Sequence, residues 1–359
     1  MLSAFFRRLT RKSAQSPATH AVRDTYAELN AAERLLAAGQ PREALPLFER
    51  LVEFQPDNAY AHNGLGICYS DIGDASNAVR HFDIAFALDD MEPAILANRV
   101  KMLIDSHQYA DALQCLNQLA ALNPDFNHLY AVYSGFCIAL GEAEKAKRAA
   151  LKAWISNFGN LRLANCYLFN GAYACTSEIR LAQEHRFWAQ TLHSVSSLPE
   201  TEDPKSPLQY VGGEPNRRIK LAYWSPDFRN HSVRYFFKPL LKGHDRSKFE
   251  IHLLHDIFTY DEHTDFFKNH CDFFHDVFDL TDQELRGFLR DNQFDILVEL
   301  AGHSSANRLN LMNERWAPVQ ITALGYPPTT GLQTVDYKLA DRFTQTSEAH
   351  LYGLSLIHI

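Results

Sequence analysis

A period of 34 residues runs through the first half of the 359-residue chain and limits its fold more than any other feature. When the sequence from Thr25 is written in blocks of 34, the same kinds of residue recur in register. One column of the blocks is alanine throughout, the next is apolar and a third is rich in glycine: Ala44, Ala78, Ala112 and Ala146; Phe48, Phe82, Leu116 and Ala150; Gly39, Gly73, His107 and Gly141. A fixed period of this length indicates stacked supersecondary units and not a single globular core.

The residue types in these columns favour pairs of antiparallel helices. Alanine allows two helices to approach closely, and Pro56 and Pro124 end a helix because proline lacks an N–H. The pattern resembles the tetratricopeptide repeat, which stacks into a solenoid with a concave binding surface. We therefore predict about four repeats over residues 25–158 and a helical extension over 159–200. Alone, this half predicts a non-catalytic scaffold that binds proteins.

Composition narrows the class of protein. Lys and Arg total 35 and Asp and Glu total 43, which gives a net charge of −8. This acidic balance argues against a non-specific nucleic-acid binder, and no apolar run reaches the roughly 18 residues that suggest a membrane span. The six cysteines form no CxxC pair, so we expect free thiols in a reducing, cytoplasmic compartment. Residues 1–24 are basic and are expected to form a flexible leader.

The second half changes its pattern. Residues 201–217 are rich in proline, glycine and charge, which is typical of a linker. From residue 218 to 341, short apolar runs alternate with helical segments, the last of which is expected over 307–316. This alternation predicts a Rossmann-like lobe, a doubly wound parallel sheet with helices on both faces. The expected fold class is thus an α-solenoid followed by an α/β lobe.

Three unusual loops follow strands of this predicted sheet. They cover residues 225–231 (SPDFRNH), 301–308 (AGHSSANR) and 325–331 (GYPPTTG). In a parallel sheet, ligands bind beyond the carboxyl ends of the strands, so the loops are expected to share one edge. The sequence contains no GxGxxG after a strand, no GxxxxGK[ST] and no GxSxG, which argues against a dinucleotide oxidoreductase, a P-loop enzyme and an α/β-hydrolase.

At these loops the chain resembles the O-linked N-acetylglucosamine transferase and SPINDLY family of glycosyltransferases. The resemblance rests on YWSPDFRNHSV (223–233), on residues 294–341, and on the order of repeats, helical linker and SPDF-containing domain. It implies a catalytic part of the GT-B type, in which two Rossmann-like lobes face each other across a cleft. Residues 218–341 would be the first lobe. The implied activity is transfer of a sugar to Ser or Thr of acceptor proteins held by the repeat groove.

The resemblance also implies a set of site residues. His231 matches the histidine proposed as the base toward the acceptor hydroxyl, and Asp227 could orient its ring. The alternative is that His231 only begins a helix. The remaining candidates are expected to bind substrate: Arg229, Asn230, His303, Asn307, Arg308, Gly325, Tyr326, Pro327, Thr329 and Thr330. Pro328 departs from the family, which usually has glycine there, and this removes an N–H from the turn.

Cofactor and donor follow from the same resemblance. The family requires no metal and no cofactor, and the implied donor is UDP-GlcNAc, with GDP-fucose as the alternative found among SPINDLY relatives. Residues 342–359 do not match the family and are expected to be a truncated or aberrant tail. Because the second lobe of the family carries most nucleotide contacts, we expect the 359 residues alone to transfer little sugar.

Overall fold

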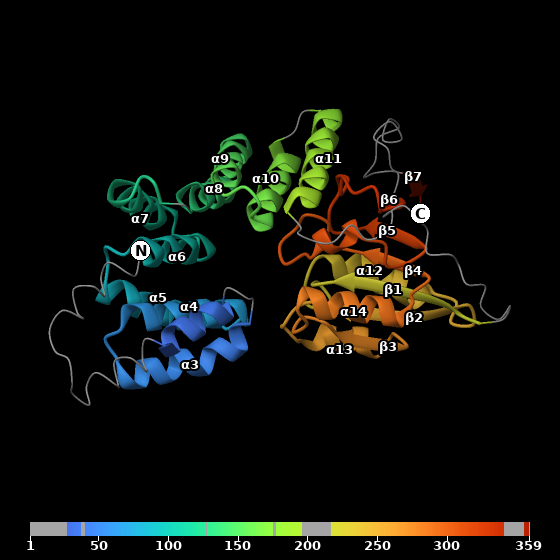
Figure 1. The fold of residues 1–359 in the computed structure, drawn as a ribbon, viewed down its shortest axis with the longest axis horizontal. Helices are drawn as coiled ribbons and strands as arrows, with labels where there is room; N and C mark the ends of the chain where they lie inside the picture. The colour runs from blue at the N-terminus through green and yellow to red at the C-terminus, as the bar shows by residue number, and fades with distance from the viewer. Residues whose placement is uncertain are drawn as a thin grey trace. The chain divides into compact units, whose positions relative to one another are not determined.

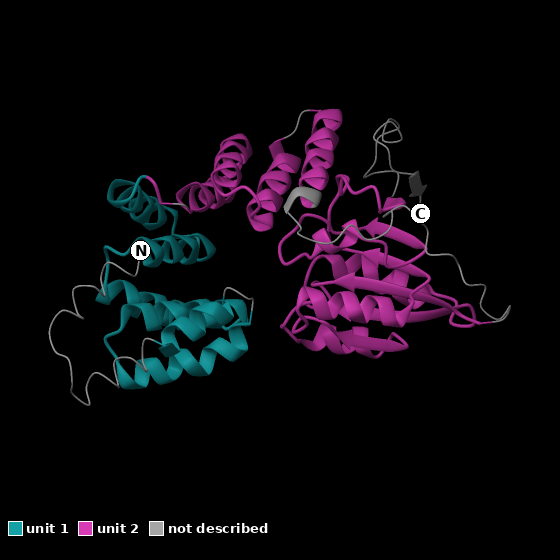
Figure 2. Cartoon of the chain, viewed as in Figure 1, with its two compact units in different colours: residues 1–124 teal, residues 125–359 magenta. Residues whose placement is uncertain are grey.

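The computed structural model describes residues 27–36, 40–126, 128–174, 177–195, 217–340 and 355–358 of the 359-residue chain. The chain divides into two compact units, residues 1–124 and 125–359 (Figures 1 and 2). The predicted leader, nearly all of the predicted linker and most of the predicted tail lie outside the described residues.

Unit 1 consists of helix pairs with the predicted period. After a helix over 27–36 come α3 (Pro41–Phe54), α4 (Ala59–Asp71), α5 (Ala75–Leu88), α6 (Pro93–Asp105) and α7 (Tyr109–Leu122). The alanine column is buried as expected, and a Cβ at Gly66 would lie 2.6 Å from the ring of Phe82. At the predicted turns, Gly73 and His107 have φ values of 82° and 59°. These contacts confirm the repeat.

Unit 2 begins with four helices: α8 (Leu129–Ala139), α9 (Ala143–Ser156), α10 (Leu161–Ala174) and α11 (Glu178–Val195). The pair α8–α9 keeps the repeat spacing, and Gly141 between them has a φ of 76°. Trp154 of α9 stacks on Tyr167 of α10, with ring centroids 5.7 Å apart. The helical extension therefore packs continuously from the repeat pair toward the sheet.

A parallel sheet forms the rest of unit 2. Its strands are β1 (Ile219–Ser225), β2 (Phe249–His255), β3 (Phe273–Asp276), β4 (Ile296–Glu299), β5 (Val319–Ala323), β6 (Tyr337–Ala340) and β7 (Ser355–His358). They pair in the order β3-β2-β1-β4-β5-β6-β7, and every pairing is parallel. The predicted Rossmann-like lobe is confirmed, and residues 355–358 of the predicted tail pair with β6.

Helices cover both faces of this sheet. Leu221 and Tyr223 of β1 pack into one core with α12 (Val233–Gly243) and α13 (Glu262–Lys268). Alternate residues of the same strand, Ala222 and Trp224, join a second core on the opposite face. That core includes α14 (Asp282–Asn292), whose N-terminus has a capping box of Thr281 and Glu284.

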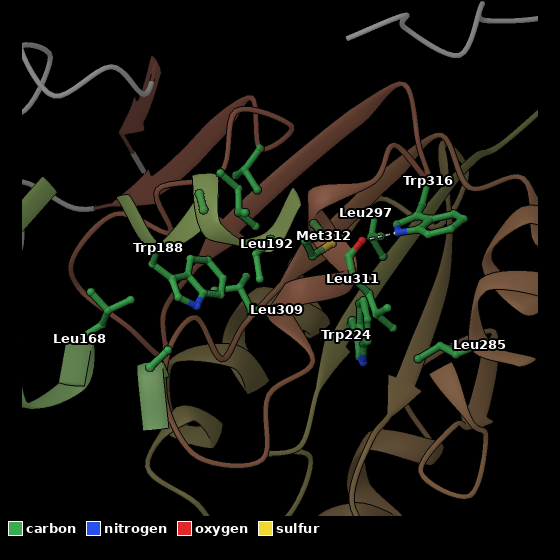
Figure 3. Packing of buried hydrophobic residues seen from close by; sticks show 14 of the residues in the cluster. Leu168, Trp188, Leu192, Trp224, Leu285, Leu297, Leu309, Leu311, Met312 and Trp316 are labelled. Carbon is green, nitrogen blue, oxygen red and sulfur yellow. Dashed lines mark hydrogen bonds between the residues drawn. The ribbon is translucent and has the colours of Figure 1, made fainter. Parts of the chain in front are cut away.

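The second core extends from the sheet to the helical extension. Figure 3 shows Trp188 and Leu192 of α11 in the same cluster as Leu309 and Trp224. Its large buried side chains hold the end of the helical extension against the lobe. The helical extension therefore contacts the loops at the sheet edge. None of the helices that the structure describes combines the length and apolar character needed to cross a bilayer.

One predicted element is wrong. The helix expected over 307–316 is only a short 3-10 helix, η1 (Leu309–Asn313). Side-chain hydrogen bonds replace the helical ones: Gln320 Nε2 donates to the carbonyl of Glu314 at 3.1 Å, and the indole of Trp316 donates to Leu311 at 2.7 Å. Tertiary contacts thus override the local helical pattern.

Candidate active site

The three unusual loops lie at one edge of the sheet, as predicted. They leave β1, β4 and β5, which pair side by side in parallel, so their carboxyl ends meet at the same edge. The side chains of the loops nevertheless form separate groups. The first group lies around Asp227 and His231, the second around His303 and Tyr326, and a small pocket adjoins Arg308.

Asp227 and His231 form the first group. Asp227 is buried, its backbone N–H donates to Ser225 Oγ at 3.0 Å, and its Oδ1 lies 3.5 Å from His231 Nδ1. Burial raises the pKa of the Asp227 carboxyl, while His231 and Arg229 act to lower it. The N–H of Val233 also approaches His231 Nδ1, at 3.4 Å. Nδ1 can accept from Val233 only without a proton and can donate to Asp227 only with one, so the two contacts belong to different tautomers of the ring.

The rest of this loop is held by its neighbours. Arg229 donates from Nε to the carbonyl of Pro226 at 3.3 Å, and its guanidinium lies 3.8 Å from Asp227. The backbone N–H of Asn230 donates to Asp261 Oδ2 at 2.5 Å. Asp261 is also the N-cap of α13, where Thr264 completes a capping box. Aspartate is a preferred N-cap residue, so Asp261 could have been recognised in the sequence, although the prediction did not include it.

His303 and Tyr326 lie in a buried group with the helical extension. His303 Nε2 lies 3.0 Å from the carbonyl of Thr330, and Nδ1 lies 2.7 Å from Asn165 Oδ1 of α10. The carbonyl of Thr330 and Oδ1 of Asn165 are both acceptors, and Nδ2 of Asn165 donates to Asn307 at 3.4 Å, so a neutral imidazole can donate to only one of its two partners. Burial lowers the pKa of His303 well below its usual value, so the ring is neutral. Both ring nitrogens of His303 thus face polar groups of the protein.

Tyr326 is tied to the same helices. Its hydroxyl lies 2.8 Å from His185 Nε2 of α11 and 3.1 Å from the carbonyl of Leu168 of α10. His185 Nδ1 lies 2.6 Å from the carbonyl of Leu181, and this bond fixes the proton on Nδ1. Nε2 of His185 and the carbonyl of Leu168 are then both acceptors for the single proton of the Tyr326 hydroxyl. The helical extension and the loop after β5 are joined by this buried polar network.

The GYPPTTG turn is shaped by protein contacts. The N–H of Gly325 donates to the carbonyl of Leu300 at 3.0 Å, and Thr330 is fully buried. Thr329 Oγ1 accepts from the N–H of Gly331 at 3.1 Å. Pro327 is exposed, and its carbonyl accepts from Lys338. The glycines of this turn, which we expected to admit a ligand, are closely approached by other parts of the chain.

Asn307 and Arg308 line a small pocket at the ends of β1, β2 and β4. Asn307 Oδ1 accepts from the N–H of Leu309 at 3.0 Å, and Arg308 Nε lies 3.7 Å from Asp256 Oδ1. The indole of Trp224 donates to the other oxygen of Asp256 at 2.8 Å. Burial raises the pKa of Asp256 to about 6, against the opposing effect of Arg308.

Two of the residues in this pocket were absent from the sequence prediction. Asp256 directly follows β2, so the reasoning applied to the other strand ends could have found it. Glu299 is the last residue of β4, and its Oε2 accepts from the N–H groups of Ala301 and Gly302 at 3.1 and 2.7 Å. It fixes the loop that carries His303. No cluster of three or more metal-ligating side chains occurs in the described part of the chain.

His185 of α11 is buried in its neutral form, and this makes the stability of unit 2 depend on pH. Burial lowers the pKa of His185 to about 4, so the unfolded chain binds a proton near pH 6 that the folded chain does not. The stabilising effect is complete above about pH 6.5 and is lost as the pH falls toward 4. We expect the free energy of unfolding to fall by about 1–3 kcal/mol across this range for this group. Urea unfolding at pH 7.5, 6 and 5 measures the change, and a His185→Gln variant with an equally steep pH dependence would contradict it.

Models of two known protein families match parts of this chain. The family model for glycosyl transferase family 41 matches residues 172–356, and a tetratricopeptide repeat model matches residues 29–92. A probable UDP-N-acetylglucosamine–peptide N-acetylglucosaminyltransferase SPINDLY of Arabidopsis thaliana is 39 % identical over 132 residues, which are 36 % of this chain and 14 % of that protein. The rice protein of the same name (Oryza sativa subsp. japonica) is 32 % identical over 183 residues, 49 % of this chain and 19 % of its own.

A solved structure is also similar. A mutant O-GlcNAc transferase of Thermobaculum terrenum is 25 % identical with a TM-score of 0.57, and the match covers 96 % of this chain and 58 % of that chain. The chain thus spans less than a fifth of the length of the Arabidopsis and rice relatives. Because the family 41 match includes the sheet, its loops and α11, and more than half of the 359 residues, the chain belongs to glycosyl transferase family 41.

Proposed function

We propose that this chain takes part in protein O-glycosylation, the transfer of N-acetylglucosamine from UDP-GlcNAc to a Ser or Thr hydroxyl of an acceptor protein. The relatives named for this activity support the reaction class. The tetratricopeptide repeats support protein as the acceptor, because solenoids of this kind present extended binding surfaces. The single observation that carries the proposal is the Asp227–His231 pair at the carboxyl edge of a family 41 lobe.

In this proposal His231 removes the proton of the acceptor hydroxyl. Asp227 holds Nδ1–H of the imidazole, and the lone pair of Nε2, for which no partner occurs among the described residues, takes the proton. The hydroxyl oxygen then bonds to the anomeric carbon of the sugar, and the bond from that carbon to the nucleoside diphosphate breaks. The diphosphate leaves with the electron pair. Imidazole suits this role because it titrates near neutral pH.

The test is transfer by the complete protein that carries this chain. Purified protein is incubated with a serine peptide and either UDP-GlcNAc or GDP-fucose, and the peptide mass is measured. A gain of one N-acetylhexosamine supports the proposal, and a gain of one deoxyhexose assigns the donor to GDP-fucose. No mass gain with either donor contradicts the proposed function. We also propose that residues 1–359 alone transfer little sugar, which the same assay measures.

Replacing Asp227 separates catalysis from stability. Asp227→Asn keeps the shape of the side chain but removes the charge that holds the His231 tautomer, so we expect transfer to fall roughly tenfold or more. Because burial raises the pKa of Asp227, the ionised form opposes folding at high pH, and its removal is expected to raise stability at pH 8 by up to about 1 kcal/mol. The gain shrinks as the pH falls below the folded pKa. Loss of activity together with lower stability at pH 8 would assign Asp227 a purely structural role.

A further inference from the structure

The surface beside the His231 loop carries cations that lack acidic partners. Arg234 lies in the first turn of α12, its backbone N–H donates to the carbonyl of His231 at 3.1 Å, and its side chain contacts His263 of α13. Lys238, one turn further along α12, lies 3.3 Å from the other nitrogen of the same ring. We call Arg234, Lys238 and His263 the α12–α13 cluster.

The α12–α13 cluster has more hydrogen-bond donors than acceptors. A neutral imidazole has one N–H and one lone pair, whereas arginine and lysine only donate. His263 can therefore accept from Arg234 or from Lys238 but not from both, and one N–H is left facing another. Arg234 Nε is buried and has no partner in the described part of the chain. The Tyr235 hydroxyl accepts from Arg234 Nη2 at 2.6 Å, and an additional anion would satisfy the donors that remain.

Nearby carboxylates do not supply that acceptor. Asp261 and Glu262 act on Lys238 only at longer range. Asp261 already accepts from the backbone N–H groups of Asn230, His263 and Thr264. Elsewhere in the lobe, arginines typically have an acidic partner, as the following show: Arg217, Arg218, Arg246, Arg286 and Arg315. Neither Arg234 nor Lys238 has such an ion pair with a described residue.

Exposed aromatic side chains adjoin the cluster. Tyr235 and Phe236 are 67 % and 65 % exposed, and the guanidinium of Arg234 lies over the Tyr235 ring, 4.3 Å from its centroid. A surface that combines cations with exposed rings suits a peptide that has carboxylates and apolar groups. The rings add contact area, and the cations select the charge.

We propose that the α12–α13 cluster recognises a carboxylate side chain of the acceptor peptide, close in sequence to the hydroxyl that is glycosylated. The inference rests on the proposed function, which places that hydroxyl at His231. An extended peptide advances about 3.3 Å per residue, and Arg234 follows His231 by less than one helical turn. The acidic residue is therefore one to three positions from the reactive serine or threonine.

Binding of labelled peptides to the complete protein tests this inference without requiring transfer. Two serine peptides are compared by fluorescence anisotropy; they differ only in carrying two glutamates or two glutamines within three positions of the serine. We expect the glutamate peptide to bind roughly tenfold more tightly at low salt, and the difference to shrink at high salt. Arg234→Gln and Lys238→Gln should each weaken the glutamate peptide roughly two- to fivefold and leave the glutamine peptide unchanged.

A control variant with the same charge change lies elsewhere on the lobe. Arg290 is exposed in the last turn of α14, at the end of the helix away from the carboxyl edge, so Arg290→Gln should affect neither peptide. Equal binding of the two peptides, or equal effects of Arg234→Gln and Arg290→Gln, overturns the inference. If the binding preference is found but no sugar is transferred, the proposed function fails while the acidic-peptide site stands. If sugar is transferred but the binding preference is absent, the acidic-peptide site fails while the proposed function stands.

Discussion

Replacing His231 by glutamine is expected to lower sugar transfer by at least about 100-fold, which is the smallest effect usual for loss of a general base. Glutamine keeps most of the polar volume of the side chain but cannot accept a proton at neutral pH. The imidazole is only partly exposed and makes its closest charged contact with Asp227. The rate of transfer by the complete protein, measured at saturating donor and peptide, gives the effect.

A surface histidine provides the matched control. His128 is exposed just before α8, in the part of unit 2 distant in sequence from the loops, and His128→Gln should leave the rate unchanged. Equal melting temperatures would show that both variants are folded. If the folded His231→Gln variant transferred sugar at a rate within a few-fold of the unmodified protein, His231 would not be the general base. It would then only begin α12, which is the alternative that the sequence left open.

Replacing Gly331 by alanine is expected to destabilise unit 2 by about 3 kcal/mol or more. Gly331 has a φ of 78°, and a Cβ there would lie 2.4 Å from the backbone carbonyl carbon and oxygen of His185. Backbone atoms of α11 cannot move aside without breaking the bond of His185 to Tyr326. The substitution should therefore separate α11 from the loop after β5.

Gly141 is the matched control for the contact between residue 331 and the His185 backbone. Its φ of 76° is almost the same, but nothing lies within 4 Å of a Cβ placed there. Gly141→Ala is expected to cost only the 1–2 kcal/mol or so of a left-handed alanine. All four tryptophans, Trp154, Trp188, Trp224 and Trp316, lie in unit 2, so fluorescence during urea unfolding reports on this unit. Similar losses in the two variants would show that the close approach to His185 has no energetic effect.

The local chemistry of the sequence predicted the repeats and the sheet. The alanine column requires close helix pairs, and the structure buries Ala44, Ala112 and Ala146 completely. The capping box of Thr281 and Glu284 at the start of α14 is a signal of the same kind, because both of its hydrogen bonds lie within four residues. Such features depend on neighbours in sequence, so they can be inferred without coordinates.

The grouping of the loop side chains could not be inferred in this way. The shared edge of the three loops followed from parallel strands, but the position of His303 depends on Asn165 and Trp188, more than 100 residues earlier in the chain. A histidine after a strand has the same local pattern whether it faces a substrate or a buried helix. The alanine column, the alternating strands and the Asp227–His231 spacing were therefore determined by the sequence alone.

Tertiary packing decided which polar loop residues remain available and which are used inside the protein. The packing of α10 and α11 buries His303, Tyr326 and Thr330, and it leaves His231 and Arg234 at the surface of the lobe. The physical reason is that burial and hydrogen-bond partners come from distant segments, whereas periodicity and capping come from adjacent ones.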